Sequence, residues 1–362
     1  VNYSVDDISI KAVTKEAGFV LTFEGKVLTY TEPVIDTTNF YVKNGGNDLL
    51  DGNTPATAWQ TIAKVNSETF NPGDQILFNK NDEWRLVDDP GGDWNMSWIG
   101  EENNHMTFGA YGTGDKPRLL GSDVVSSWTS IGDTIWWTYK ASLDTFPQSR
   151  IFFELVTDTT VWGILEADAS KASLDTVYEY YYILDTIYIR HESVTSPSTF
   201  YSSIEIPQVE NIIEIQTRYD SAEYYTFDGF EIAYCKDIGI RNDWPGGING
   251  QTRQVSGLEI RNCHIHHIAY KGSVSGVGII PIFSDVIIED NEINDCGRRA
   301  ISFNIDGSGN ADTCENIIIR NNNFHDGWHT TGLDLATAST MVYDIQYYNN
   351  THTDSKTISL TA

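Results

Sequence analysis

The chain has 362 residues, and its 23 Lys plus Arg against 51 Asp plus Glu give a net charge of −28. Nucleic acid and anionic membranes are therefore excluded as partners, because both require a cationic surface. A hydrophobic fraction of 40% excludes a disordered acidic chain, and no segment approaches the roughly 18 consecutive apolar residues of a membrane span.

Residues 1–38 come first and alternate weakly between apolar and polar side chains. Ile8 and Ile10 form one such pattern, and Phe19, Leu21 and Phe23 form another. No basic segment followed by an apolar one is present at the start, so nothing here indicates a secretion signal. The pattern predicts a small β segment or attachment arm.

A short helix is predicted at residues 55–66. Thr54 is suited to its N-cap and Pro55 to its first position, and an apolar stripe follows at Ala58, Trp59, Ile62 and Val65. The preceding loop, 44–53, is rich in Gly, Asn and Asp without the EF-hand spacing. Either a turn before the helix or a Ca²⁺ loop fits it, and we expect no cofactor otherwise.

Residues 128–205 carry a different pattern, with Trp136, Trp137, an aromatic run at 180–182 and an alternating segment at 185–190. They predict a β-rich excursion that leans on the rest of the chain rather than an independent domain.

An internal repeat occupies residues 224–362. The segments that align are 227–232, 260–265, 288–293, 319–324 and 347–352, about 30 residues apart. Each continues into a further short strand, at 238–240, 277–279, 300–303, 332–335 and 357–360. Three short strands per unit predict coils that stack with parallel strands roughly 4.8 Å apart. We therefore expect Asn291, Asn322 and Asn350 to form a ladder in one tight turn.

The four cysteines lack the spacing of a zinc site. Cys235 and Cys296 share a repeat position two coils apart, which is too far for a disulfide. We expect buried, free thiols.

Four segments near the beginning, 40–48, 51–59, 72–78 and 109–117, look like the opening coils of carbohydrate-active β-helix proteins. With the repeat, they make roughly residues 39–360 similar to the right-handed parallel β-helix superfamily typified by pectate lyase and polygalacturonase. The resemblance implies an all-β right-handed parallel β-helix over 39–362, with an N-terminal capping helix at 55–66 and a β-rich excursion at about 128–205. That superfamily contains lyases, hydrolases, epimerases, phage tailspikes and adhesins, so the fold does not fix the reaction.

The resemblance also places most known active sites on the outer face of the third strand of each coil and on its flanking turns. Alternation predicts one outward row of Gly239, Gly278, Ser302, Asp334 and Ser359, and a second of Arg241, Ile280, Asn304, Ala336 and Thr361. The candidates for catalysis are Asp334, Arg298, Arg299, His329 and Lys271. The candidates for substrate binding are Trp328, Asn304, Asp306, Arg241 and Trp244.

These residue types suit a polysaccharide lyase slightly better than a glycoside hydrolase. Lys271, Arg298 and Arg299 would neutralise a uronate carboxylate, and His329 would transfer a proton. Asp334 would orient the substrate or act as acid or base, and a hydrolase would need Asp306 as its companion. The structural alternatives are solvated turn residues and arginines paired with the abundant carboxylates.

A second polar constellation lies on the middle strand of the repeat. His264 aligns with Glu292, while His266, Asn294 and His325 form the next row. His267, Asp295, Asp326 and Asp354 share the position after that. Stacked carboxylates repel unless hydrogen-bonded or bridged by a cation. The favoured interpretation is a set of side chains that close turns, with a metal site as the alternative.

The sequence thus predicts a carbohydrate-active enzyme that cleaves an extracellular polysaccharide. The rival is a non-catalytic glycan-binding subunit, such as a phage tailspike or a surface adhesin. No capping sequence follows the last predicted strand, so we expect a second copy or another partner to cover that end. The location expected is extracellular, on a cell surface or on a virion.

Overall fold

A computed structural model describes residues 9–11, 20–23, 26–29, 37–88, 94–140, 150–157, 159–166, 170–216, 223–242, 255–269, 276–303, 312–327, 330–335, 340–353 and 358–359. The chain divides into two compact units, Val1–Thr37 and Thr38–Ala362. The first unit contains an antiparallel sheet of β1 (Ser9–Lys11), β2 (Val20–Phe23) and β3 (Lys26–Thr29) in that order.

The second unit is built on three parallel sheets, here called the first, second and third sheet in the order that each coil visits them. The first sheet contains β4 (Asn39–Val42), β5 (Gln75–Asn79), β8 (Met106–Tyr111), β20 (Tyr225–Asp228), β23 (Ser256–Arg261), β26 (Ser284–Glu289), β30 (Ile317–Arg320) and β34 (Ile345–Tyr348). The second sheet contains β6 (Glu83–Arg85), β9 (Arg118–Leu120), β21 (Glu231–Ala233), β24 (His264–Ile268), β27 (Glu292–Cys296), β31 (Asn323–His325) and β35 (Thr351–His352).

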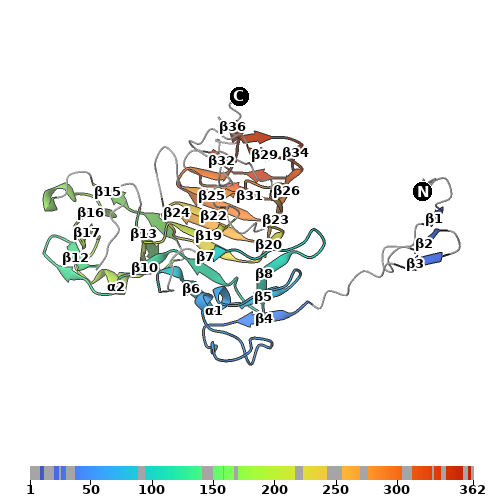
Figure 1. Ribbon diagram of the computed structural model, residues 1–362. Helices are drawn as coiled ribbons and strands as arrows, with labels where there is room; N and C mark the ends of the chain where they lie inside the picture. Colours follow the sequence, from blue (N-terminus) through green and yellow to red (C-terminus); the bar gives the residue numbers. More distant parts are fainter. Residues whose placement is uncertain are drawn as a thin grey trace. The chain divides into compact units, whose positions relative to one another are not determined.

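The third sheet contains β7 (Trp94–Met96), β19 (Asn211–Ile215), β22 (Ile238–Asn242), β25 (Val277–Ile280), β28 (Arg299–Ser302), β32 (Thr330–Asp334) and β36 (Ile358–Ser359). Figure 1 shows these strands stacked from β4 (blue) to β36 (red). A separate parallel pair joins β29 (Asp312–Cys314) to β33 (Thr340–Val342). The second unit is therefore β-rich with parallel sheets.

Strand register confirms the predicted repeat. Phe227, Ile260, Ile288, Ile319 and Tyr347 are successive partners on the first sheet. The second sheet repeats this with Ile232, Ile265, Ile293, Phe324 and His352. Most of these side chains are fully buried in one apolar core that all three sheets share. Apolar side chains at equivalent positions in successive coils thus fix the register.

The asparagine ladder is also confirmed. Asn291 Oδ1 accepts the backbone N–H of Cys263, and Asn322 Oδ1 accepts that of Asn291. Asn350 Oδ1 accepts the N–H of Asn322 in turn. Each Nδ2 donates to a carbonyl on the coil before, so the ladder satisfies backbone groups in a turn too tight to satisfy them itself.

The predicted rows on the third sheet were wrong by two residues. Register pairs Ile240 with Ile279, Ile279 with Ile301, and Ile301 with Leu333. The row that contains Ser302, Asp334 and Ser359 therefore continues through Ile280 and Arg241, not through Gly278 and Gly239. A two-residue slip keeps every side chain on its predicted face, so alternation alone could not detect it.

The predicted helix starts later than expected. Helix α1 spans Ile62–Asn66, and its N-cap is Thr61, whose side chain accepts from the Lys64 N–H. Thr54 instead forms a turn with Thr57. Trp59 pairs with the backbone of β4 in a bridge to Val42. The apolar stripe is real, but its first half is extended chain that adds to the first sheet.

Loop 44–53 is tied to this helix by a carboxylate. Asp48 accepts from the backbone N–H groups of Gln60 and Thr61 at 2.7 and 3.1 Å and from the Thr61 hydroxyl at 2.7 Å. A Ca²⁺ loop here stays a prediction.

The excursion leaves the second sheet after β9 and returns at β19. One of its sheets contains β10 (Ser122–Val124), β18 (Tyr201–Pro207), β13 (Phe152–Leu155) and β14 (Thr160–Trp162). The other contains β11 (Thr129–Ser130), β12 (Ile135–Tyr139), β17 (Thr186–Arg190), β16 (Glu179–Ile183) and β15 (Ile164–Leu165). Short helices occur at α2 (Pro197–Phe200), η1 (Leu86–Asp88) and η2 (Lys171–Ser173), the first and last within the excursion. Phe152 packs on Leu120, Ala233 and Tyr234, which joins the excursion to the second sheet.

All four cysteines are buried and free, as predicted. Among the described residues, no helix is long and apolar enough to cross a membrane.

Candidate active site on the second sheet

The structure pairs and buries two of the residues predicted to line the third-sheet site. Arg299 and Asp334 are only 6% and 1% exposed, and the Arg299 guanidinium forms an ion pair with the Asp334 carboxylate. Ser302 donates to the same carboxylate at 3.4 Å. The expectation that Asp334 faces solvent was wrong, because an outward position on a strand can still be covered by other parts of the chain. The pairing of Arg299 with a carboxylate is the structural alternative predicted for it.

Two other predicted residues are half-buried. Arg241 donates through Nε to the carbonyl of Asn242 at 3.2 Å. Arg298 has a buried Nη1 that contacts no acceptor within the described part of the chain. The remaining candidates, Lys271, His329, Trp328, Asn304, Asp306 and Trp244, lie outside the described residues.

A continuous polar network crosses the outer face of the second sheet instead. Its first row runs through Glu83, Arg118, Glu231, His264 and Glu292 on successive strands. Arg118 bridges Glu83 at 3.0 Å and Glu231 at 2.8 Å. Opposite charges alternate from Glu83 through Arg118 to Glu231, because parallel pairing places equivalent residues side by side, where like charges would repel.

Two buried histidines extend the network. His266 Nε2 lies 3.3 Å from Glu231, and His266 Nδ1 lies 2.5 Å from His267 Nδ1. Because Glu231 can only accept a hydrogen bond, the proton of neutral His266 lies on Nε2, and its Nδ1 is an acceptor. The contact between the two Nδ1 atoms therefore requires His267 to donate through its own Nδ1. His267 Nε2 is then a free acceptor, 3.8 Å from Asp295.

Burial sets the charge states of these groups. It lowers the pKa of His266 to about 4, although its bond to Glu231 opposes the change. Burial, together with the charges of His266 and His264, also lowers the pKa of His267. Burial alone would raise the pKa of Glu231, but the contacts with His266 and Arg118 outweigh it and lower that pKa to about 2. At neutral pH, two neutral imidazoles therefore face an ionised carboxylate.

Asp295 is the acid at the far end of the network. Burial raises the pKa of this carboxyl, although hydrogen bonds from Asn294 at 2.7 Å and from the Trp162 indole at 3.2 Å oppose the rise. Its side chain is 23% exposed, so solvent still reaches it. Trp162, which is half-buried, belongs to the excursion, 133 residues away in sequence.

A more exposed trio lies beside it. His325 contacts Glu292 at 3.0 Å through Nε2 and Asp326 at 2.8 Å through Nδ1. Burial lowers the pKa of His325, but the bonds to these two carboxylates outweigh it and raise it overall. Burial would raise the pKa of Glu292, yet the bond from His325 and the neighbouring imidazoles lower it. Glu292 is 49% exposed and ionised.

The C-terminal ends of these strands share one backbone conformation. Tyr234, His267, Asp295 and Asp326 all have positive φ, between 48° and 63°. This supports the predicted alignment of the three titratable members, while Asp354 lies outside the described residues. Left-handed backbone at a non-glycine residue costs energy, and here it turns each side chain towards its neighbours in adjacent coils.

The other side of the network joins the excursion. Arg85 forms an ion pair with buried Glu205 at 2.8 Å. Tyr234 donates to Glu154 at 2.7 Å, and burial raises the pKa of Glu154 despite that bond. The excursion thus contributes both an aromatic ring and carboxylates to the edge of the site.

Within the described residues, no group of three or more His, Cys, Asp or Glu side chains is arranged to hold a metal ion. The His-and-carboxylate rows were foreseen from the repeat, but their contact with Trp162 was not. The excursion carries no repeat pattern from which its docking position could be predicted.

No protein-family model matches the chain, and no curated protein matches it. Among solved structures, a complex of XylC with xylose has a TM-score of 0.42 at 14% identity, over 85% of this chain and 70% of that one. GH136 lacto-N-biosidase from Eubacterium ramulus has a TM-score of 0.42 at 14% identity, over 89% and 57%. Pectate lyase Pel9A has a TM-score of 0.38 at 12% identity, over 83% and 54%.

The chain spans just over half the length of the last two structures. The parallel sheets of the second unit agree with the β-rich fold class that the repeat predicts.

Proposed function

We propose that the chain hydrolyses glycosidic bonds of a polysaccharide, with Asp295 as general acid and Glu292 as general base. The observation that supports this is a pair of carboxyl groups on one strand whose environments move their pKa values in opposite directions. Burial raises the pKa of Asp295, whereas His325 lowers that of Glu292. One carboxyl that holds a proton and one that does not are what glycoside hydrolysis requires.

The form of the reaction that we propose is inverting. Inverting enzymes hold their carboxyl groups about 6.5–9.5 Å apart, with room for a water molecule between them, and retaining enzymes only about 5–5.5 Å. Glu292 would then activate that water molecule while Asp295 protonates the leaving oxygen.

Trp162 suits a sugar ligand. An aromatic face packs against the apolar face of a pyranose ring, and its indole N–H already holds Asp295 in place. A ring bound on Trp162 would lie next to the acid that protonates its glycosidic oxygen.

A second candidate is the β-elimination reaction of a lyase. Arg298 supports it, because its buried Nη1 has no acceptor in the described residues and a uronate carboxylate would supply one. The two reactions leave different products, since elimination creates an unsaturated uronate that absorbs ultraviolet light and hydrolysis does not.

The test is incubation with a panel of acidic and neutral polysaccharides, with reducing ends and ultraviolet absorbance measured together. We expect new reducing ends without absorbance, and an inverted anomer in the first product seen by NMR. Asp295→Asn and Glu292→Gln should each lose activity by at least about 100-fold, whereas Asn323→Ala on the neighbouring strand should retain it. Absorbance that rises with the reducing ends, and that falls in Arg298→Ala, would establish the lyase instead.

We further infer that successive coils wind in a right-handed sense, the strong preference for parallel crossovers, with α1 closing the N-terminal end of the stack. An extracellular location and a partner over the β34–β36 edge complete the proposal. If no member of the panel is cleaved but glycans still bind, the chain is a non-catalytic glycan-binding subunit, such as a tailspike or adhesin.

A further inference from the structure

A pocket on the first sheet lies apart from the residues assigned to hydrolysis. Its volume is about 380 Å³, which is within the range of small-molecule sites. Its lining comes from β5, β8 and β20 and from the turns that follow these strands and β23. The lining residues are Gln75, Leu77, Lys80, Gly109, Ala110, Lys116, Asp228, Gly229 and Asn262.

A missing side chain creates the hollow. The outward row of the first sheet runs from Tyr41 through Leu77 to Gly109, and Asp228 and Arg261 continue it on the next strands. A Cβ built on Gly109 would meet Leu77 Cδ2 at 3.4 Å and the Asp228 carbonyl at 3.7 Å, which are ordinary contact distances. A side chain would therefore fit at this position, and its absence leaves the floor of the pocket open.

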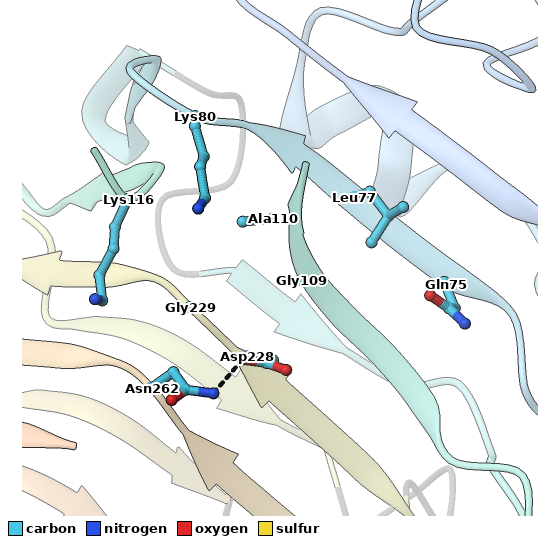
Figure 2. A pocket seen from close by; sticks show the side chains of 9 residues that line it. All are labelled: Gln75, Leu77, Lys80, Gly109, Ala110, Lys116, Asp228, Gly229 and Asn262. Carbon is cyan, nitrogen blue, oxygen red and sulfur yellow. Dashed lines mark hydrogen bonds between the residues drawn. The ribbon is translucent and has the colours of Figure 1, made fainter. Parts of the chain in front are cut away.

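Two lysines in the pocket lining form no ion pair with a described carboxylate. Lys80 and Lys116 form no ion pair with any described carboxylate, whereas Lys64, Lys140 and Lys171 each do. In a chain with more than twice as many acids as cations, two such lysines at one pocket are an unusual feature. Figure 2 shows both side chains extended beside Ala110 at one end of the pocket, with Gln75 at the other.

The one carboxylate in the lining is already neutralised. Asp228 forms an ion pair with Arg261 at 3.1 Å and accepts from Asn262 Nδ2 at 2.9 Å, the contact drawn in Figure 2. An anion that enters the pocket therefore meets two lysines and no unpaired acid. The amides of Gln75 and Asn262 can both donate and accept, as recognition of sugar hydroxyls requires.

We propose that this pocket is a second saccharide site that binds one anionic sugar residue, a uronate. Lys80 and Lys116 hold the carboxylate, and Gln75 and Asn262 hydrogen-bond to the ring hydroxyls. The site is independent of the proposed hydrolysis. It would anchor an acidic polysaccharide to the first sheet, away from the carboxyl groups of the second.

The test is isothermal titration of the full chain with galacturonate, glucuronate, glucose and inorganic phosphate. Monosaccharides contain no glycosidic bond, so the result does not depend on cleavage. We expect a uronate to bind and glucose to bind at least about tenfold more weakly, since a charge-assisted hydrogen bond is worth about that factor or more. Raising the salt concentration should weaken uronate binding.

Variants then locate the site. Lys80→Ala with Lys116→Ala should abolish uronate binding, and Gly109→Leu should do so by filling the floor without removing a charge. Lys171→Ala, which removes a lysine from the excursion, should bind like the unaltered chain. Circular dichroism establishes whether each variant is folded. If Gly109→Leu does not fold, the double variant Lys80→Ala with Lys116→Ala tests the proposal by itself.

Three results would overturn the proposal. They are the absence of uronate binding to the unaltered chain, undiminished binding in the folded double lysine variant, and phosphate binding as tight as that of the uronates. The last would mean a site for a bare anion rather than for a sugar.

Discussion

His266 should make the protein sensitive to mild acid. Its pKa lies at about 4 in the folded protein against an ordinary 6.5, so the unfolded chain takes up a proton at a pH where the folded chain does not. The free energy that neutral His266 contributes to folding is thus complete above pH 6.5 and falls as the pH drops towards 4. At about 1.4 kcal/mol per pH unit, the loss amounts to at most about 3.5 kcal/mol.

The perturbation is His266→Gln, which keeps a nitrogen donor for Glu231 but cannot titrate. Urea unfolding followed by tryptophan fluorescence at pH 7, 6, 5 and 4.5 gives the free energy of unfolding of both proteins. We expect the variant to be less stable at pH 7, where the packing of the imidazole is lost. The difference in the free energy of unfolding should shrink or reverse by pH 4.5. Only in the unaltered chain does residue 266 take up a proton on unfolding, and this uptake favours the unfolded state. Glu231 titrates in a lower window, between 4.5 and about 2, and contributes little to this comparison.

His325→Gln is a control of opposite sign on the same sheet. The pKa of His325 is raised by its two carboxylate partners, so its contribution is complete below pH 6.5 and is lost as the pH rises through its folded value. This variant should therefore lose most stability at acidic pH. If His266→Gln and the unaltered chain differ by the same free energy at every pH, the histidine is not held neutral, and the account of the network is wrong.

Three further predictions concern single contacts. Asn322→Ala should cost about 2–4 kcal/mol by urea unfolding, because it leaves the N–H of Asn291 and the carbonyl of Ile288 on the preceding coil unsatisfied, while Asn323→Ala should cost less than about 1 kcal/mol. Arg299→Met should cost about 3–5 kcal/mol, since it leaves Asp334 buried and unpaired, and adding Asp334→Leu should restore much of that stability. Trp162→Phe removes a hydrogen bond that lowers the pKa of Asp295, so the alkaline limb of kcat/KM should move to higher pH; a limb that stays in place would argue against Asp295 as the acid.

The coils of the second unit could be predicted because their information is local and repeated. An apolar residue at the same position in each unit specifies the register, and Ile260, Ile288 and Ile319 need only stack on one another. The third sheet shows the limit of this inference. Gly239 and Gly278 have no side chain to mark a row, so a slip by two residues preserved the apparent alternation and went undetected.

The start of the helix and the burial of Asp334 were mispredicted for a different reason. Trp59 has the spacing of a helical stripe, but a backbone bridge to Val42 offers it a strand partner that lies outside its own segment. Asp334 was predicted to face solvent from the alternation of its strand alone. Which outward positions are covered depends on long-range packing, and that is absent from a local pattern.

The site on the second sheet depends both on the local repeat and on long-range packing. Parallel stacking alone would place Asp295 beside Asp326 in the next coil, and two such carboxylates repel. Repulsion raises the pKa of one member, but in open solvent the effect is small because water screens it. The excursion reaches this carboxyl through the Trp162 indole, whose hydrogen bond opposes the rise in the pKa of Asp295 that burial produces. Burial outweighs that bond and raises the pKa of Asp295, while Glu292, three residues earlier on the same strand, is more exposed and has a lowered pKa. The pKa of Asp295 is thus set by the docked excursion as well as by the coil that contains this residue.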